Sequence, residues 1–241
     1  MVNNFALVFG AALASAALGY VGWRFKVVDK SGYASGVVLA TAVMAFVPMQ
    51  WFIPLVSLVV IGGAASRYKV EVKRTLGVAE RRKGRGALNV FGNGGVALAC
   101  ALTFELTQNP LALVAYISSI SAACADTVAA EIGQLSRKKP LLITTLAPVR
   151  TGTDGGITLQ GTIAGLLGAA LVSLTVYAFS VSPLVHWKLF AASALAGFIG
   201  TNADSLIGAT LERARKTDKH STNFLASLTG AVAGIILYSF F

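Results

Sequence analysis

The stretch ALNVFGNGGVALACALTFELTQNPLALVAYISSISAACADTVAAEI, residues 87–132, decides the fold class of this chain. It contains two apolar runs, 87–106 and 110–132, which are separated by a short polar turn. A helix needs about 20 apolar residues to cross the hydrocarbon core of a bilayer. Two such runs in succession therefore predict a pair of membrane-spanning helices.

The composition extends this prediction to the whole chain. The 241 residues are 55% hydrophobic and only 12% charged, with a mean hydropathy of +0.71, whereas soluble domains carry about 25% charged residues. We expect an all-α, polytopic transmembrane helix bundle that forms a single domain over 1–241. Residues 1–84 would hold the N-terminal helices and a basic loop, and residues 85–241 the motifs. About eight spans are predicted, at 3–23, 33–48, 50–65, 87–106, 110–132, 156–180, 187–212 and 222–241.

The stretch 33–65 and the first apolar run differ from the other predicted spans. Pro48 and Pro54 leave open whether 33–65 forms two full spans or a broken hairpin. The first apolar run has no basic residue before Arg24, so we interpret it as a retained span and not as a cleaved signal peptide.

The positive charge is distributed very unevenly. A net charge of +10 would suggest a nucleic-acid partner in a soluble protein, but here the charge lies in short loops between apolar runs. Of the 20 Lys and Arg residues, all except Lys188 fall in four loops, 24–32, 66–86, 133–155 and 212–221. With eight spans these loops share one side, and short basic loops are cytoplasmic. We therefore expect no nucleic-acid partner, both termini outside and these four loops in the cytoplasm.

Two pairs of strings suggest a parallel internal repeat of helix pairs. ADTVAAEIG at 125–133 resembles ADSLIGATLE at 203–212, and GNGGVAL at 92–98 resembles TDGGITL at 153–159. The pair of spans 87–132 would then repeat as 156–212 in the same orientation. In several membrane folds the functional site lies at the interface between such repeats.

Asp126, Glu131 and Asp204 lie inside predicted spans, where an ionisable group is costly and usually faces a cavity or a partner. Asp126 is roughly 9 Å and Asp204 roughly 12 Å from the cytoplasmic end of its span, while Glu131 is nearer that end. One reading is that Arg137 or Arg213 pairs with these acids. The other is that the carboxylates converge on Mg²⁺, which prefers carboxylate, water and phosphate oxygens.

Two glycine-bearing segments, Asn89–Gly95 and Thr151–Gly156, each come before or at the start of a span that leads away from the cytoplasm. Free N–H groups at a helix N-terminus bind anions, and glycine lets the backbone approach them closely. The alternative to an anion site is that these residues only cap the helices and allow them to pack closely through small side chains. The neighbouring basic residues, which include Arg85 and Arg150, favour a phosphate site.

The strings DTVAAEIG at 126–133 and TGTDGGIT at 151–158 resemble those of a family of integral membrane proteins that includes the phytyl-phosphate kinases of plants and cyanobacteria. The resemblance covers most of 85–241. It implies transfer of a phosphoryl group from a nucleoside triphosphate to an isoprenoid monophosphate such as phytyl or geranylgeranyl phosphate. A more distant likeness to CTP-using phytol and dolichol kinases suggests CTP as the donor.

This resemblance gives the candidate residues roles in a Mg²⁺-dependent isoprenyl-phosphate kinase whose site faces the cytoplasm. Asp126, Glu131 and Asp204 would bind Mg²⁺, and Arg150 and Lys139 would stabilise the transferred charge. The nucleotide and phosphate ligands would be Asn89, Asn93, Gly94, Gly95, Thr151, Thr153, Gly155, Gly156 and Lys138. Asp154 departs from the family pattern and places a negative charge beside this cradle. A transporter and another lipid-phosphate transferase are the alternative functions.

Overall fold

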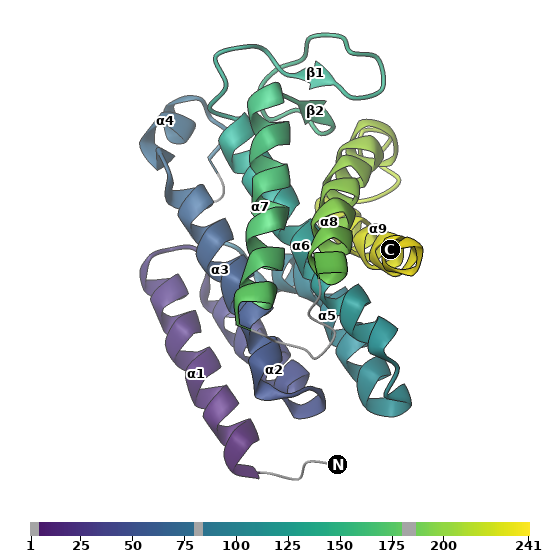
Figure 1. The fold of residues 1–241 in the computed structure, drawn as a ribbon. Helices are drawn as coiled ribbons and strands as arrows, with labels where there is room; N and C mark the ends of the chain where they lie inside the picture. Colours follow the sequence, from purple (N-terminus) through teal and green to yellow (C-terminus); the bar gives the residue numbers. More distant parts are fainter. Residues whose placement is uncertain (1–4, 80–83, 180–186) are drawn as a thin grey trace.

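The computed structural model describes residues 5–79, 84–179 and 187–241, and these are almost entirely helical (Figure 1). The long helices are α1 Phe5–Arg24, α2 Lys30–Phe46, α3 Phe52–Arg67, α5 Ala87–Thr107, α6 Pro110–Gly133, α7 Leu159–Ala178, α8 Trp187–Ile207 and α9 Lys219–Phe240. The short elements are the 3₁₀ turn η1 Met49–Trp51, helix α4 Val70–Thr75, strands β1 Leu141–Leu142 and β2 Gly156–Ile157, and the π-helical turn η2 Gly208–Glu212.

The long helices fall on the predicted apolar ranges, which confirms a helical membrane bundle. Within the described residues, four of them, α5, α6, α7 and α9, are long and apolar enough to cross a membrane by length and composition. The apolar helix α3, with 16 residues, is shorter. The count of eight spans therefore stays a prediction.

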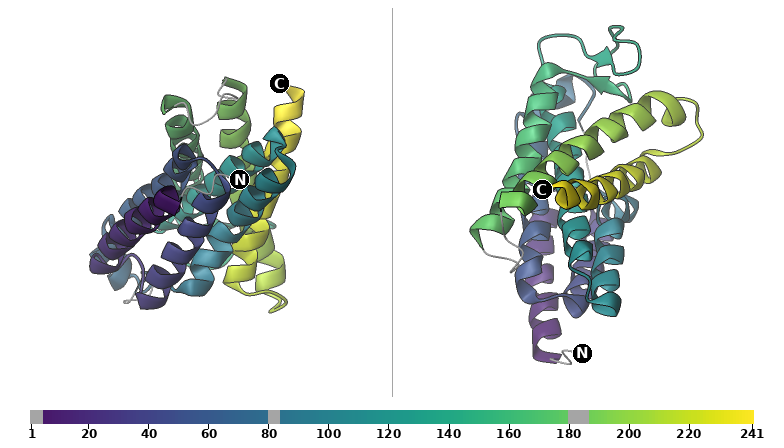
Figure 2. Two further views of the ribbon diagram at one scale, coloured as in Figure 1. Left: turned by 90° about the horizontal axis from the view of Figure 1, so that it is seen from below. Right: turned by 45° about the vertical axis from the view of Figure 1, so that its right-hand side comes forward.

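Helix α6 lies at the centre of the bundle and is buried along most of its length. It packs against α3, α5, α7, α8 and α9 (Figures 1 and 2). Small residues allow this packing: a Cβ atom on Gly200 of α8 or Gly230 of α9 would come within 2.5 Å or 2.6 Å of Ala122 Cβ on α6. Such close contacts between small residues are typical of helices packed in membranes.

The stretch 33–65 forms two separate helices. Helix α2 ends at Phe46, and η1 then leads directly into α3. The turn is held to the centre of the molecule, because the Tyr116 hydroxyl of α6 donates a hydrogen bond of 2.7 Å to the carbonyl oxygen of Trp51. The sequence left open whether this stretch forms two full spans or a broken hairpin, and the structure shows two helices joined by a short 3₁₀ turn.

Three of the four basic loops lie toward one end of the bundle (Figure 1), and the fourth, the α1–α2 connection, contacts one of them. Figure 1 shows α4, the β1–β2 pair and the α8–α9 connection in the upper half of the molecule. The α1–α2 connection joins them through a short backbone ladder, in which Arg85 N–H donates to Val27 O and Asp29 N–H donates to Arg85 O, both at 3.0 Å. This is the arrangement expected if the basic loops share one face of a membrane.

The two glycine strings of the proposed repeat have different structures. GNGGVAL at 92–98 lies inside α5, whereas TDGGITL at 153–159 forms a turn, strand β2 and the first residue of α7. Strand β2 pairs with β1 in antiparallel register, with Leu142 opposite Gly156. The similarity of the strings thus does not extend to their local structure, and the internal repeat itself remains a prediction.

Candidate functional site

A polar pocket with a cavity volume of about 130 Å³ lies where α6 and α8 end and α7 and α9 begin. It is lined by residues of α6, α7 and α8, of the loop 151–158 and of η2. The ionisable residues that line it are Asp126, Asp154, Asp204, Glu212 and Lys219. The described lining residues thus bring four carboxylates and one ammonium group together, which suits a cation better than a bare anion.

Asp126 of α6 and Asp204 of α8 come together in this pocket, as their matching depth predicts. Their side chains are within hydrogen-bonding distance of each other, and both interact electrostatically with Lys219. Among the described residues, Oδ2 of Asp204 is buried and has no hydrogen-bond partner. Two carboxylates in contact repel unless they share a proton or bind a cation. The pair is therefore a candidate for Mg²⁺ binding.

The loop 151–156 is fitted closely onto the π-helical turn that follows α8. Gly155 has φ +76°, and a Cβ atom there would lie only 2.5 Å from the backbone nitrogen of Ala209. Across this contact, Gly208 would bring a Cβ to 3.0 Å from Gly155 N. Widened helical turns of this type occur often at functional sites. The loop, with Thr151, Thr153, Gly155 and Gly156, is thus held as one wall of the polar pocket, where the sequence analysis placed a phosphate cradle.

A second, larger cavity of about 740 Å³, here called the outer pocket, opens beside the first. The two share Asp126, Gln134, Thr151, Asp154 and Lys219, among others, so they form one continuous polar site. Residues from all four basic loops line the outer pocket. A ligand bound there would contact every one of these loops.

Several buried polar atoms around the two pockets have no partner among the residues that the structure describes. They are Gln134 Oε1, Asp204 Oδ2, His220 Nδ1 and Asn223 Oδ1. Most buried polar atoms in folded proteins form at least one hydrogen bond, so four unpaired atoms around one site suggest that a polar ligand or ordered water binds there.

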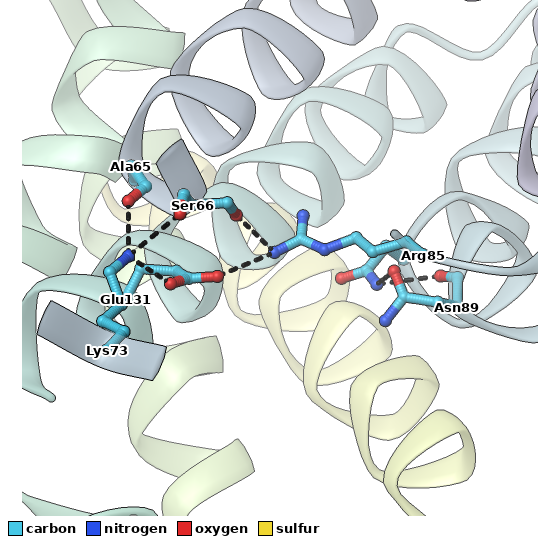
Figure 3. A network of polar contacts seen from close by, with 7 residues as sticks. Ala65, Ser66, Lys73, Arg85, Asn89 and Glu131 are labelled. Carbon is cyan, nitrogen blue, oxygen red and sulfur yellow. Dashed lines mark hydrogen bonds and ion pairs between the residues drawn. The ribbon is translucent and has the colours of Figure 1, made fainter. Parts of the chain in front are cut away.

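Glu131 lies in a different environment from the two aspartates. Its Oε2 accepts a hydrogen bond of 2.6 Å from the ammonium group of Lys73, whose side chain is 1% exposed, and its Oε1 is 3.6 Å from a guanidinium nitrogen of Arg85 (Figure 3). Lys73 also donates to the carbonyl oxygens of Ala65 and Ser66. The carboxylate is thus engaged by two cations from the 66–86 loop, and neither is the Arg137 or Arg213 that sequence reasoning suggested.

The residues Asn89–Gly95 form a stretch of helix and not a helix N-terminus. Helix α5 begins at Ala87, so the backbone around Gly94 and Gly95 is inside the helix. A Cβ on Gly94 would meet Leu39 of α2 at 2.9 Å, and one on Gly95 would meet Phe224 of α9 at 3.3 Å. These glycines therefore serve helix packing, the alternative considered from the sequence.

The asparagines of the same string do reach the site. Asn89 and Asn93 line the outer pocket, and the Asn93 amide donates hydrogen bonds to the backbone oxygen of Asn89 at 2.8 Å and to its side-chain oxygen at 3.2 Å. Asn89 and Asn93 can therefore contact a ligand in the outer pocket through their side chains, from one face of α5.

The basic residues of the 133–155 loop lie away from the pockets, and another lysine occupies the site. Lys138, Lys139 and Arg150 are exposed and are not among the described lining residues of either pocket. Lys219, the first residue of α9, lines both. Sequence reasoning had counted Lys219 only as a topology signal. The available clue was Asp218, a good N-cap residue, which places Lys219 in the first turn of the last helix.

Comparison with known proteins places the chain in a family. The model of the family described as integral membrane protein DUF92 matches residues 13–235. The chain is 34% identical over 215 residues to membrane protein MJ0933 of Methanocaldococcus jannaschii, covering 89% of this chain and 87% of the relative. It is 36% identical over 191 residues to membrane protein sll0875 of a Synechocystis strain, covering 78% and 73%.

A plant relative is more distant. Protein VTE6, chloroplastic, of Arabidopsis thaliana is 30% identical over 221 residues, which cover 87% of this chain and 65% of the relative. No solved structure matches the chain significantly. The family match spans most of the residues, including both motif strings and all the acids of the polar pocket, and the chain therefore belongs to the integral membrane protein DUF92 family.

Proposed function

We propose that this membrane protein transfers a phosphoryl group from a nucleoside triphosphate, with CTP as the first donor to test, to an isoprenoid monophosphate and so forms the diphosphate. The observation that carries the proposal is the convergence of Asp126 and Asp204 in a polar site where the four basic loops meet. The resemblance of the motif strings to a family that contains phytyl-phosphate kinases supplies the reaction type.

The donor set fits Mg²⁺ bound together with a nucleotide. The described residues contain no group of three or more His, Cys, Asp or Glu side chains able to hold a metal ion by themselves. Mg²⁺ is commonly bound by one or two carboxylates, with waters and substrate phosphates as the other ligands. Asp126 and Asp204 would hold the ion, which when bound would neutralise charge on the phosphate oxygens. Glu131 is left out of this set because it is paired with Lys73.

The remaining groups of the site would position the two substrates. Lys219 would donate to phosphate oxygens, a role that we now give to it instead of Lys139 and Arg150, because it lines both pockets. The loop 151–156 would supply the hydroxyls of Thr151 and Thr153, together with backbone N–H groups other than those of Thr153 and Gly156, which donate hydrogen bonds within the loop. The side chains of Asn89 and Asn93 would contact the acceptor phosphate from the opposite wall of the outer pocket.

In the transfer itself, no protein side chain needs to form a covalent bond to a substrate. An oxygen of the acceptor monophosphate would form a bond to the terminal phosphorus of the donor, and the bond from that phosphorus to the bridging oxygen would break, releasing the nucleoside diphosphate. The acceptor oxygen is already anionic, so no general base is required. Orientation and charge neutralisation by the residues above are sufficient for catalysis of this type.

The position of the site favours an enzyme over a transporter. Substrate sites in secondary transporters lie near the bilayer midplane. Here the acids lie at the end of the bundle that carries the basic loops, with Asp126 seven residues before the last residue of α6. A site at this end can take a water-soluble nucleotide and a membrane-bound acceptor at once.

The direct test is a reaction with purified protein in detergent or nanodiscs. Phytyl, geranylgeranyl and farnesyl monophosphates are each incubated with Mg²⁺ and one of CTP, ATP, GTP or UTP, and the lipid products are separated and identified by mass. The proposal requires formation of the isoprenoid diphosphate that is lost with Asp204→Asn. Absence of diphosphate with every acceptor and nucleotide, from protein with an unchanged melting temperature, would refute it.

A further inference from the structure

An apolar pocket of about 160 Å³ lies between α1, α2, α3 and α5, next to the polar site. Its walls are almost entirely aliphatic or aromatic side chains and glycines, contributed by all four helices. Val59, one of these lining residues, is 46% exposed, so the pocket reaches the outer surface of the helices. In a membrane bundle that surface faces lipid.

The polar residues of this apolar pocket are concentrated where it meets the outer pocket. Arg85, Asn89, Asn93 and Thr127 line both cavities. The remaining polar side chains in its lining are Ser15 and Tyr33. The two cavities thus form an amphipathic pair, with a polar compartment bearing carboxylates, cations and amides on one side of these four residues and a hydrocarbon-like compartment on the other.

From this arrangement we infer that the pocket between α1, α2, α3 and α5 binds the first segment of the isoprenoid tail of the acceptor, while its phosphate occupies the outer pocket beside Arg85, Asn89 and Asn93. The inference rests on the proposed function for the identity of the amphiphile. It assigns a role to the N-terminal helices, for which the sequence motifs gave none.

The volume of the pocket limits how much of the tail it holds. An apolar cavity of about 150 Å³ in a protein binds one benzene molecule, which has six carbon atoms. A pocket of 160 Å³ therefore has room for about one five-carbon isoprene unit. The rest of the chain leaves past Val59 into lipid. The affinity of the protein should then depend strongly on the unit next to the phosphate and weakly on total chain length.

Gly36 of α2 offers a way to fill the pocket without disturbing the fold. It lines the pocket, and a Cβ atom added there meets no atom within 4 Å. Gly10 of α1 likewise has open space around an added Cβ but is not among the described lining residues of the pocket. Leucine is a better helix former than glycine, so Gly36→Leu and Gly10→Leu are matched substitutions that differ in access to the pocket.

The experiment uses a farnesyl monophosphate probe with a diazirine in its first isoprene unit and the purified full chain in nanodiscs. After illumination, peptide mass spectrometry should locate the adducts on residues that line the pocket. Gly36→Leu should abolish these adducts and raise the Kd of unlabelled farnesyl monophosphate at least about tenfold, equal to about 1.4 kcal/mol, while Gly10→Leu changes neither.

The outcomes separate this inference from the proposed function. Adducts at the pocket in a protein that forms no diphosphate would support the tail site and refute the kinase. Diphosphate formation with adducts spread over other lipid-facing helices, or adducts unaffected by Gly36→Leu, would overturn the tail site and leave the kinase standing. A Kd that falls steadily with each further isoprene unit would also contradict the inference, because it would require a longer pocket.

Discussion

Asp126 and Glu131 are five residues apart on α6, yet their carboxylates have opposite surroundings. Asp126 faces another carboxylate in a solvent-accessible pocket, whereas Glu131 is closed in by Lys73 and Arg85. Asp126 thus lines both pockets beside a second carboxylate, whereas Glu131 lines only the outer pocket and is already paired with two cations. Substitutions at the two positions should accordingly have opposite effects on stability and on activity.

For Asp126→Asn we expect loss of turnover without loss of stability. The amide keeps the size and polarity of the side chain but removes the charge that would balance a bound cation, and it relieves the repulsion from Asp204. The melting temperature should be unchanged or higher, and the kinase rate should fall by at least about a hundredfold, a typical minimum when an electrostatic catalytic group is removed. Both are measured on the same sample, and a folded, fully active variant would exclude the metal assignment.

For Glu131→Gln we expect a destabilised protein. The change leaves the buried ammonium group of Lys73 without its counter-charge, and breaking a buried pair in this way costs roughly 3–5 kcal/mol. Adding Lys73→Met should recover most of the lost stability. Chemical denaturation in detergent measures both variants. If Glu131→Gln instead keeps full stability and loses Mg²⁺-dependent activity, Glu131 belongs with the metal ligands after all.

At the scale of elements, the loop 151–156 and the turn η2 act as one unit, because they meet through glycine backbone. Gly155→Ala combines a left-handed backbone conformation with a Cβ that would be 2.4 Å from Ala209 Cβ, so it should displace the loop and lower both stability and activity. Gly77→Ala is the control for stability: its φ is also positive, at +71°, but no atom lies within 4 Å of an added Cβ, so the substitution should cost only about 1 kcal/mol for the left-handed backbone conformation. Equal effects of the two substitutions would show that the contact with η2 is unimportant.

Gly156→Ala should act on substrate binding and leave the aspartate pair intact. A Cβ at this position would be 2.9 Å from the carbonyl oxygen of Thr153, so the turn must open slightly. We expect a higher KM for the nucleotide or the acceptor, with the Mg²⁺ dependence of the rate unchanged. Steady-state kinetics at varied Mg²⁺ and nucleotide concentrations test this, and a change confined to the Mg²⁺ dependence would contradict it.

Helix α9 begins with a cap that holds Lys219 in place. The Asp218 carboxylate accepts a hydrogen bond of 2.8 Å from the backbone N–H of Ser221, and this bond lowers the pKa of Asp218 below its usual range. The stabilisation is therefore present above about pH 4, the pKa of an unfolded aspartate, and is lost as the pH falls through the lower folded pKa. Asp218→Ala should lower the melting temperature at neutral pH and Asp218→Asn should not, because asparagine also caps helices. Equal melting temperatures would show that the cap contributes nothing.

Sequence reasoning located the elements better than the partners of individual residues. Apolar runs of nearly constant length predict helices, and an aspartate inside such a run is costly unless it functions, so Asp126 and Asp204 could be found from the sequence. The partner of Glu131 could not, because Lys73 is 58 residues away and reaches it only through the packing of α4. The two glycine strings are similar in sequence, and only the structure shows that one lies inside a helix and the other in a loop and a short strand.

For the molecule as a whole, the arrangement of loops fits the proposed reaction, in which one substrate is water-soluble and the other is membrane-bound. All four basic loops contribute residues to the outer pocket, and two of their cations, Arg85 and Lys219, line the site where phosphates would bind. The helices below it supply the apolar compartment. A nucleotide can reach such a site from water while the acceptor enters from the bilayer, provided that the basic end faces the cytoplasm.

That orientation can be tested with single cysteines at the two ends of the bundle. In a variant without Cys100 and Cys124, Lys138→Cys probes the basic loop after α6, and Gln108→Cys probes the exposed turn between α5 and α6 at the other end of α6. Short basic loops remain in the cytoplasm, so an impermeant maleimide added to intact cells should label Gln108→Cys and not Lys138→Cys. Permeabilised cells should show labelling of both. Labelling of Lys138→Cys from outside would place the basic loops, and with them the candidate site, on the wrong side of the membrane for a cytoplasmic nucleotide.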